Sequence, residues 1–129
     1  MVDPLHALDL GVSQDTLGNV CFEFWYSPMS KTRGRESKTQ ELWLLIKTYY
    51  KRATPPTRIS ALTEDMIKQK GKGPTFRGKA AETRHLVPFA CELAVEIAKA
   101  AGGTNAYYNQ LANMMHLLLT LYMTFGQMP

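Results

Sequence analysis

Apolar residues recur at intervals of three and four through most of this chain of 129 residues, which is the spacing of one face of an α-helix. No stretch alternates apolar and polar residues regularly enough to indicate a β-strand. The segment from Leu111 to Phe125 is apolar around most of its circumference, which is typical of a core helix or an interface. The sequence therefore predicts an all-α fold in one domain, residues 1–129, with five to six helices in a single irregular bundle.

Proline, glycine and polar clusters mark the expected ends of the helices. Ser27-Pro28 ends the first helix, the Thr54-Pro55-Pro56-Thr57 segment ends the second, and Gly102-Gly103 ends the fourth. Pro88 lies inside the fourth helical pattern, where it should kink the helix or divide it in two. The expected helices span about 4–25, 37–52, 63–69 and 79–101, followed by a final helix capped by Thr104 or Asn105.

Charge is distributed unevenly along the chain. Residues 31–84 contain fourteen basic and five acidic residues, whereas the remainder contains one basic and six acidic residues, although the net charge is only +4. A basic middle indicates an anionic partner, nucleic acid before all others. A solvated positive face that only aids solubility explains the same pattern equally well. Two exposed basic loops are expected, at 30–37 and 68–79.

The second basic loop combines glycines with lysines, so both its backbone amides and its cations can approach a phosphate. Gly73 to Gly78 followed by Lys79 is not a Walker A loop, because Ala80 stands where a hydroxyl is required and no apolar strand precedes it. The candidate nucleic-acid-binding residues are Lys68, Lys70, Lys72, Arg77, Lys79 and Arg84.

The remaining polar side chains do not form a self-contained catalytic site. Asp3 and His6 lie three residues apart at the start of the first expected helix, where they either shape a site or serve as a helix cap and a surface histidine. His85 and His116 lie within apolar helical segments, and a hydrogen-bonded structural role is expected for both.

Cys21 and Cys91 have neither the spacing of a zinc site nor that of a disulfide framework. We expect two buried free thiols in a reducing, intracellular compartment, and no cofactor or metal. The longest apolar run, Met114 to Phe125, is too short to span a bilayer, so no membrane association is expected.

Two stretches of the chain resemble a known family. Asp3-Pro-Leu-His6-Ala-Leu-Asp-Leu-Gly-Val12, followed by Leu17-Gly-Asn, resembles the acid-or-cysteine, x, x, histidine motif of eukaryotic cut-and-paste DNA transposases, as in the hAT and CACTA superfamilies. The stretch from Gly78 to Pro88 is similar to a segment of transposon-derived open reading frames that carry this motif. Together the two stretches cover about a quarter of the chain.

The resemblance implies a helical insertion within an RNase H-like catalytic domain. In that family, three carboxylates hold two divalent metals that activate the attacking oxygen and stabilise the leaving one during DNA cleavage. The resemblance places this chain after the first two carboxylates and before the third. It implies that Asp3 and His6 support the site without ligating metal, and that the chain is a fragment with no catalytic activity on its own.

Three hypotheses for function follow. The first is a transposase-derived helical domain that binds the DNA backbone nonspecifically, with a nuclear location. The second is a protein-interaction module that uses the Met- and Tyr-rich final helix. The third is a degenerate element-derived frame without a selected function. The contacts expected for a protein partner or for self-association are Leu111, Met114, Met115, Leu118 and Tyr122.

Overall fold

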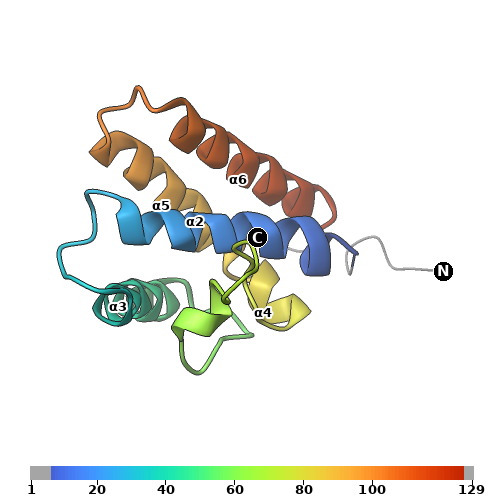
Figure 1. Ribbon diagram of the computed structural model, residues 1–129. Coiled ribbons are helices and arrows are strands. Elements are labelled where there is room, and N and C mark those ends of the chain that lie inside the picture. The colour runs from blue at the N-terminus through green and yellow to red at the C-terminus, as the bar shows by residue number, and fades with distance from the viewer. Residues whose placement is uncertain (1–6, 127–129) are drawn as a thin grey trace.

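The computed structural model describes residues 7–126 of the chain. Within this range it contains five α-helices, one π-helical turn, one short 3-10 helix and no β-strand, which confirms the predicted all-α fold. Asp3, His6 and the expected helix start at Pro4 lie outside the described residues. In chain order the elements are η1 (Asp9–Ser13, π-helical), α2 (Gln14–Tyr26), α3 (Arg35–Ala53), η2 (Glu64–Met66, 3-10), α4 (Ala80–Arg84), α5 (Val87–Ala100) and α6 (Ala106–Thr124) (Figure 1).

Helix α2 runs through the middle of the molecule, with the α5–α6 pair on one side and α3 on the other (Figure 1). Helices α5 and α6 are antiparallel and joined by a tight turn at Gly102 and Gly103, which have φ of 92° and 80°. Glycine adopts these positive φ values without steric strain. The Gly103 amide donates to the Ala98 carbonyl at 2.9 Å, which satisfies a carbonyl at the end of α5.

One cluster of buried apolar side chains joins α2, α3, α5 and α6. Each fully buried large side chain stabilises the fold by roughly 1.5–3 kcal/mol relative to an exposed one. Cys21 and Cys91 are buried and unpaired, as expected, and burial raises the pKa of the Cys21 thiol to about 12. The largest fully buried side chains are Leu17, Phe24 and Trp25 from α2, Leu42 and Ile46 from α3, Ile67 and Phe76 from the segment between α3 and α4, Leu86 before α5, Ile97 from α5, and Met115, Leu118 and Tyr122 from α6.

The fourth expected helix is divided, as the position of Pro88 predicts. Helix α4 ends at Arg84 and α5 begins at Val87, which puts Pro88 in the first turn of α5. The missing N–H of proline leaves no hydrogen bond unmade at that position. The first expected helix differs from its prediction, because a π-helical turn at Asp9–Ser13 interrupts the α-helical pattern.

The second expected helix begins earlier than predicted. Helix α3 starts at Arg35, so the first basic loop ends at Gly34 and the last three residues of the expected loop 30–37 are helical. Glu41 of α3 orders this loop by accepting hydrogen bonds from the Lys31 amide at 3.1 Å and from the amide and hydroxyl of Thr32. Burial alone would raise the pKa of Glu41, but these hydrogen bonds lower it to about 2.

Candidate functional site

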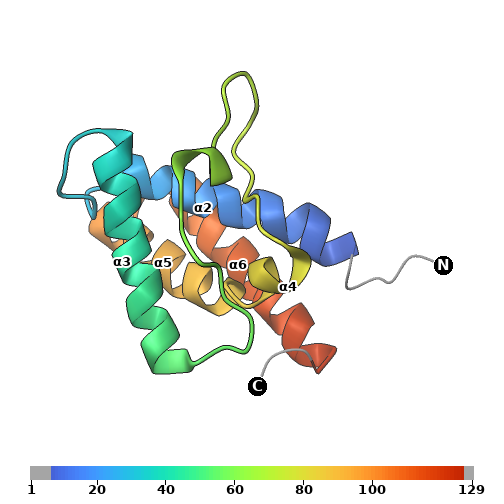
Figure 2. The same ribbon diagram turned by 90° about the horizontal axis from the view of Figure 1, so that it is seen from below.

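The second basic loop, residues 68–79, projects from the body of the molecule (Figure 2). The chain leaves the core at Ile67 and returns at Phe76, both of which are buried. The Thr75 amide donates to the Ile67 carbonyl at 3.0 Å, and the Arg77 amide donates to the Met66 carbonyl at 2.8 Å. These two hydrogen bonds join the outgoing and returning segments of the loop, so the base of the basic loop is fixed while its tip extends into solvent.

The returning end of the basic loop packs directly against α2. The Phe76 amide donates to the Gln14 carbonyl at 2.8 Å, and the Gln14 side-chain amide donates to the Gly78 carbonyl at 2.9 Å. Gly18 makes this approach possible, because a Cβ at that position would lie 2.5 Å from the Thr75 carbonyl carbon. A glycine inside α2 therefore determines where the basic loop is attached.

Most of the predicted cations of this loop are available for binding. Lys70, Lys72, Arg77 and Lys79 are exposed, and none of them forms an ion pair within residues 7–126. Lys68 is half-buried, and its ammonium donates to the Gln69 carbonyl at 2.9 Å. The structure thus groups four unpaired cations on one segment of about ten residues.

Arg84, the remaining candidate, is separate from this group. Its guanidinium lies 3.4 Å from the Asp9 carboxylate, and the side chains are 20% and 3% exposed respectively. The Tyr122 hydroxyl donates to the other Asp9 oxygen and lies 2.8 Å from the Ser13 hydroxyl. Burial and the hydrogen bond to Asp9 raise the pKa of Tyr122. The Asp9 carboxylate therefore links η1 to Arg84 of α4 and to Tyr122 of α6, and we exclude Arg84 from the candidate interface because it is bound to this buried carboxylate.

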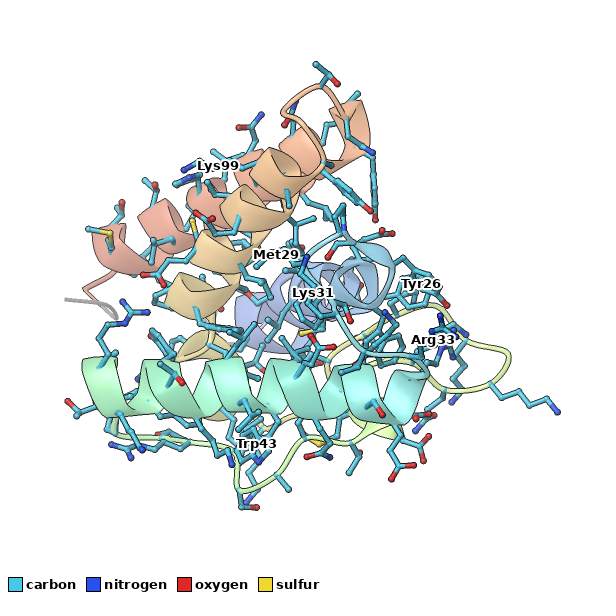
Figure 3. The ribbon with its side chains drawn as sticks, turned by 90° about the vertical axis from the view of Figure 1, so that its left-hand side faces the viewer. Tyr26, Met29, Lys31, Arg33, Trp43 and Lys99 are labelled. Atoms are coloured by element: carbon cyan, nitrogen blue, oxygen red, sulfur yellow. The ribbon has the colours of Figure 1, made fainter. Side chains whose placement is uncertain are left out.

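The other basic residues of the middle segment do not form one patch. Arg52 pairs with Glu92 at 2.8 Å, and Arg35 stacks on the Trp25 ring with its guanidinium 4.9 Å from the ring centroid. Arg33 is exposed in the first basic loop, on the side of the molecule toward which the second basic loop projects (Figure 3). The positive charge of the sequence is thus divided between cations that already have partners and cations that are unpaired.

The exposed surface of α6 differs from the predicted contact set. Met115, Leu118 and Tyr122 are at most 2% exposed and belong to the core, so they cannot contact a partner without unfolding. They are buried because their spacing places them on the side of α6 that faces α2 and α5. Leu111 is half-buried, and Met114 is 42% exposed. The exposed apolar side chains of this helix are Tyr107, Met114, Leu117, Leu121 and Met123.

Both histidines within the described residues have a hydrogen-bond partner. The His85 Nδ1 lies 2.8 Å from the Ala81 carbonyl, and the His116 Nδ1 lies 3.3 Å from the Cys91 sulfur, so both are hydrogen-bonded as expected. Burial and the nearby Glu92 carboxylate raise the pKa of Cys91, which keeps the thiol protonated and poorly nucleophilic. No three metal-ligating side chains converge anywhere in residues 7–126.

Comparisons of the chain with protein-family models, with curated proteins and with solved structures found no match. The resemblance to hAT and CACTA transposases therefore stays a prediction. None of the helices in the described part of the chain is long and apolar enough to cross a membrane.

Proposed function

We propose that this chain binds nucleic-acid backbones without sequence preference, through Lys70, Lys72, Arg77 and Lys79 of the basic loop. The observation that carries the proposal is the grouping of four exposed, unpaired cations on a loop whose base is hydrogen-bonded to α2 and η2. A phosphate backbone presents a regular row of negative charges, and flexible lysine ammonium groups bind such charges without reading the bases.

The fixed base of the basic loop favours binding by limiting the conformational entropy that is lost on contact. Four phosphate contacts give an expected slope of about −3.6 for the logarithm of the association constant against the logarithm of salt concentration on duplex DNA. Arg33 lies on the side of the molecule toward which the basic loop projects (Figure 3), and a fifth phosphate contact from it would steepen the slope to about −4.5.

The resemblance to transposases supports the same proposal and specifies its setting. In this setting, the cations of the helical insertion would hold the DNA backbone while a catalytic domain supplied by other parts of the protein cleaves it. In this setting the chain has no catalytic activity by itself, and its location is nuclear. Magnesium-dependent nicking of supercoiled DNA by the isolated chain would contradict this part of the proposal.

Fluorescence anisotropy with a labelled duplex at several salt concentrations tests the DNA interface. The double variant Lys70→Glu, Lys72→Glu should weaken binding and make the salt slope shallower by about 2. The matched control is Lys47→Glu, Lys51→Glu, which changes the net charge equally on exposed positions of α3. Equal losses in both variants would show that net charge alone drives binding, and no binding at low salt would refute the proposal.

A second candidate function is self-association through α6. The helix contains no charged residue, and Tyr107, Met114, Leu117 and Leu121 form an exposed stripe at helical spacing. A second copy of the chain is the occupant that this stripe suits, because an uncharged surface brings no like charges together when two identical copies meet. Burial of these side chains would stabilise a dimer.

Sedimentation equilibrium over a range of protein concentrations tests this second candidate. Leu117→Lys should shift the chain to a monomer, because it places a charge in the centre of the stripe. Thr120→Lys adds the same charge on the polar side of α6 and should leave the association unchanged. A wild-type chain that remains monomeric at about 100 μM would rule out self-association of useful strength.

A further inference from the structure

A pocket of about 510 Å³ lies between the end of α3 and the end of α6. Both helix ends are on the side of the molecule opposite the tip of the basic loop (Figure 2). The pocket is lined by the last turn of α3, the loop that follows α3, the junction between α4 and α5, and the end of α6. Its volume falls within the range of small-molecule sites. Neither the proposed nucleic-acid interface nor the exposed stripe of α6 uses this pocket.

The pocket wall is apolar and conformationally restricted. Thr54 has a φ of 46°, in the left-handed region that a β-branched residue rarely adopts, and Pro55 and Pro56 follow it directly. The two proline rings fix the backbone of this wall, so the pocket exists before any ligand binds. Leu119 and Met123 of α6 form the facing wall, and methionine sulfur makes favourable contacts with aromatic rings.

The charged groups at the rim neutralise one another. Arg52 donates two hydrogen bonds to the Glu92 carboxylate, at 3.2 and 2.8 Å, and its guanidinium lies 5.5 Å from the centroid of the Tyr49 ring. A ligand of either charge would be attracted by one member of this pair and repelled by the other. The pocket therefore favours an uncharged ligand.

His85 lines the pocket, and one of its two ring nitrogens is already hydrogen-bonded within α4. A carbonyl oxygen accepts but cannot donate, so the proton between His85 and the Ala81 carbonyl is on Nδ1. In the neutral form of the ring, Nε2 then carries the lone pair, and Nε2 has no hydrogen-bond partner among the described residues. The Tyr49 hydroxyl does not compete for it, because that hydroxyl donates to the His85 carbonyl at 3.3 Å.

We propose that this pocket binds an uncharged aromatic molecule that carries one N–H or O–H donor. The flat ring packs between the proline wall and the α6 wall, and the donor hydrogen-bonds to the Nε2 of His85. Aromatic rings suit the site because both walls are formed by prolines, methionine and leucine, which offer flat or adaptable apolar surfaces.

Indole and 1-methylindole are the probes that test the proposal, because they differ only in whether the ring nitrogen carries a hydrogen, which can be donated, or a methyl group, which cannot. Isothermal titration calorimetry with the full chain should show indole binding at a single site, with a dissociation constant at or below about 1 mM. 1-Methylindole should bind about tenfold more weakly, because it leaves the acceptor on His85 unsatisfied. Equal affinity for the two probes, or no heat from indole, would overturn the proposal.

Variants identify the residues that bind the probe. His85→Asn keeps a donor for the Ala81 carbonyl but lacks the Nε2 acceptor, so it should reduce indole affinity about tenfold and leave 1-methylindole unchanged. Met123→Arg should abolish binding of both probes by filling the pocket. His116→Asn, outside the pocket, is the matched control and should change neither affinity. An effect of His116→Asn as large as that of His85→Asn would refute the assigned site.

Discussion

Replacing Gly18 with alanine tests whether the close contact between α2 and the basic loop holds the loop in place. In an exposed helix, alanine would be favoured over glycine by about 1 kcal/mol. Here the new Cβ would lie 2.5 Å from the Thr75 carbonyl carbon and 2.6 Å from the Phe76 nitrogen. These are backbone atoms, so the whole returning segment must move away from α2.

The movement breaks the hydrogen bond from the Phe76 amide to the Gln14 carbonyl, worth about 1 kcal/mol, and partly exposes a Phe76 side chain that is 1% exposed. Partial exposure of a phenylalanine costs about 2 kcal/mol. After the gain in helix propensity is subtracted, Gly18→Ala should lower the free energy of unfolding by about 2 kcal/mol.

Gly11→Ala is the matched control, because nothing lies within 4 Å of a Cβ at that position. It should raise the free energy of unfolding by about 0.5–1 kcal/mol through helix propensity alone. Urea denaturation followed by far-ultraviolet circular dichroism measures both variants. If Gly18→Ala is as stable as Gly11→Ala, the packing of the basic loop on α2 does not contribute as we argue.

Two further substitutions test other contacts of the fold. Glu41→Gln should lower stability by about 1 kcal/mol near neutral pH, because the carboxylate accepts several hydrogen bonds and is only partly buried. The pKa of Glu41 is lowered from 4.5 to about 2, so its contribution is present above pH 4.5 and is lost as the pH falls through 2. Urea midpoints measured from pH 6 to pH 2 should therefore converge for wild type and Glu41→Gln, and parallel curves would contradict this. Tyr122→Phe should cost about 1–3 kcal/mol by leaving an oxygen of the buried Asp9 without its donor, and an unchanged urea midpoint would show that Arg84 alone satisfies Asp9.

The sequence predicts most helix ends because these depend on local chemistry, although the expected helix at 63–69 is only the 3-10 turn η2. Pro88 divides the fourth helical segment because proline has no N–H to donate to the preceding turn. Asn105 caps α6 by accepting a hydrogen bond from the Tyr108 amide at 3.0 Å. Thr104 and Asn105 were both predicted as caps. Which of the two caps α6 depends on the residue at which the backbone enters the helix. Such features involve residues within a single turn, so a linear pattern is sufficient to find them.

The tertiary partners of polar residues could not be predicted in the same way. The sequence gives no indication that Arg84 pairs with Asp9, 75 positions away, or that Tyr122 donates to the same carboxylate. The apolar pattern of α6 likewise does not separate Met115, which faces the core, from Leu117, which is 61% exposed. The attachment of the basic loop to α2 had one signal in the sequence, which was Gly18. Glycine lowers helix propensity, so its presence inside a predicted helix indicates that another segment packs closely there.

Positions 31–84 contain fourteen basic residues, and how many of them can bind a polyanion depends on which are already paired with a carboxylate. A cation already paired with a carboxylate, as Arg52 is with Glu92, must give up that interaction before it gains one with phosphate, so its net contribution is small. A lysine at the tip of the basic loop gives up only water and loosely held counterions. The salt slope therefore counts unpaired cations rather than basic residues. A slope between about −3.6 and −4.5 fits the loop acting alone or with Arg33, whereas a much steeper slope would require cations outside the loop, such as Lys47 and Lys51 of α3, to contact the backbone as well.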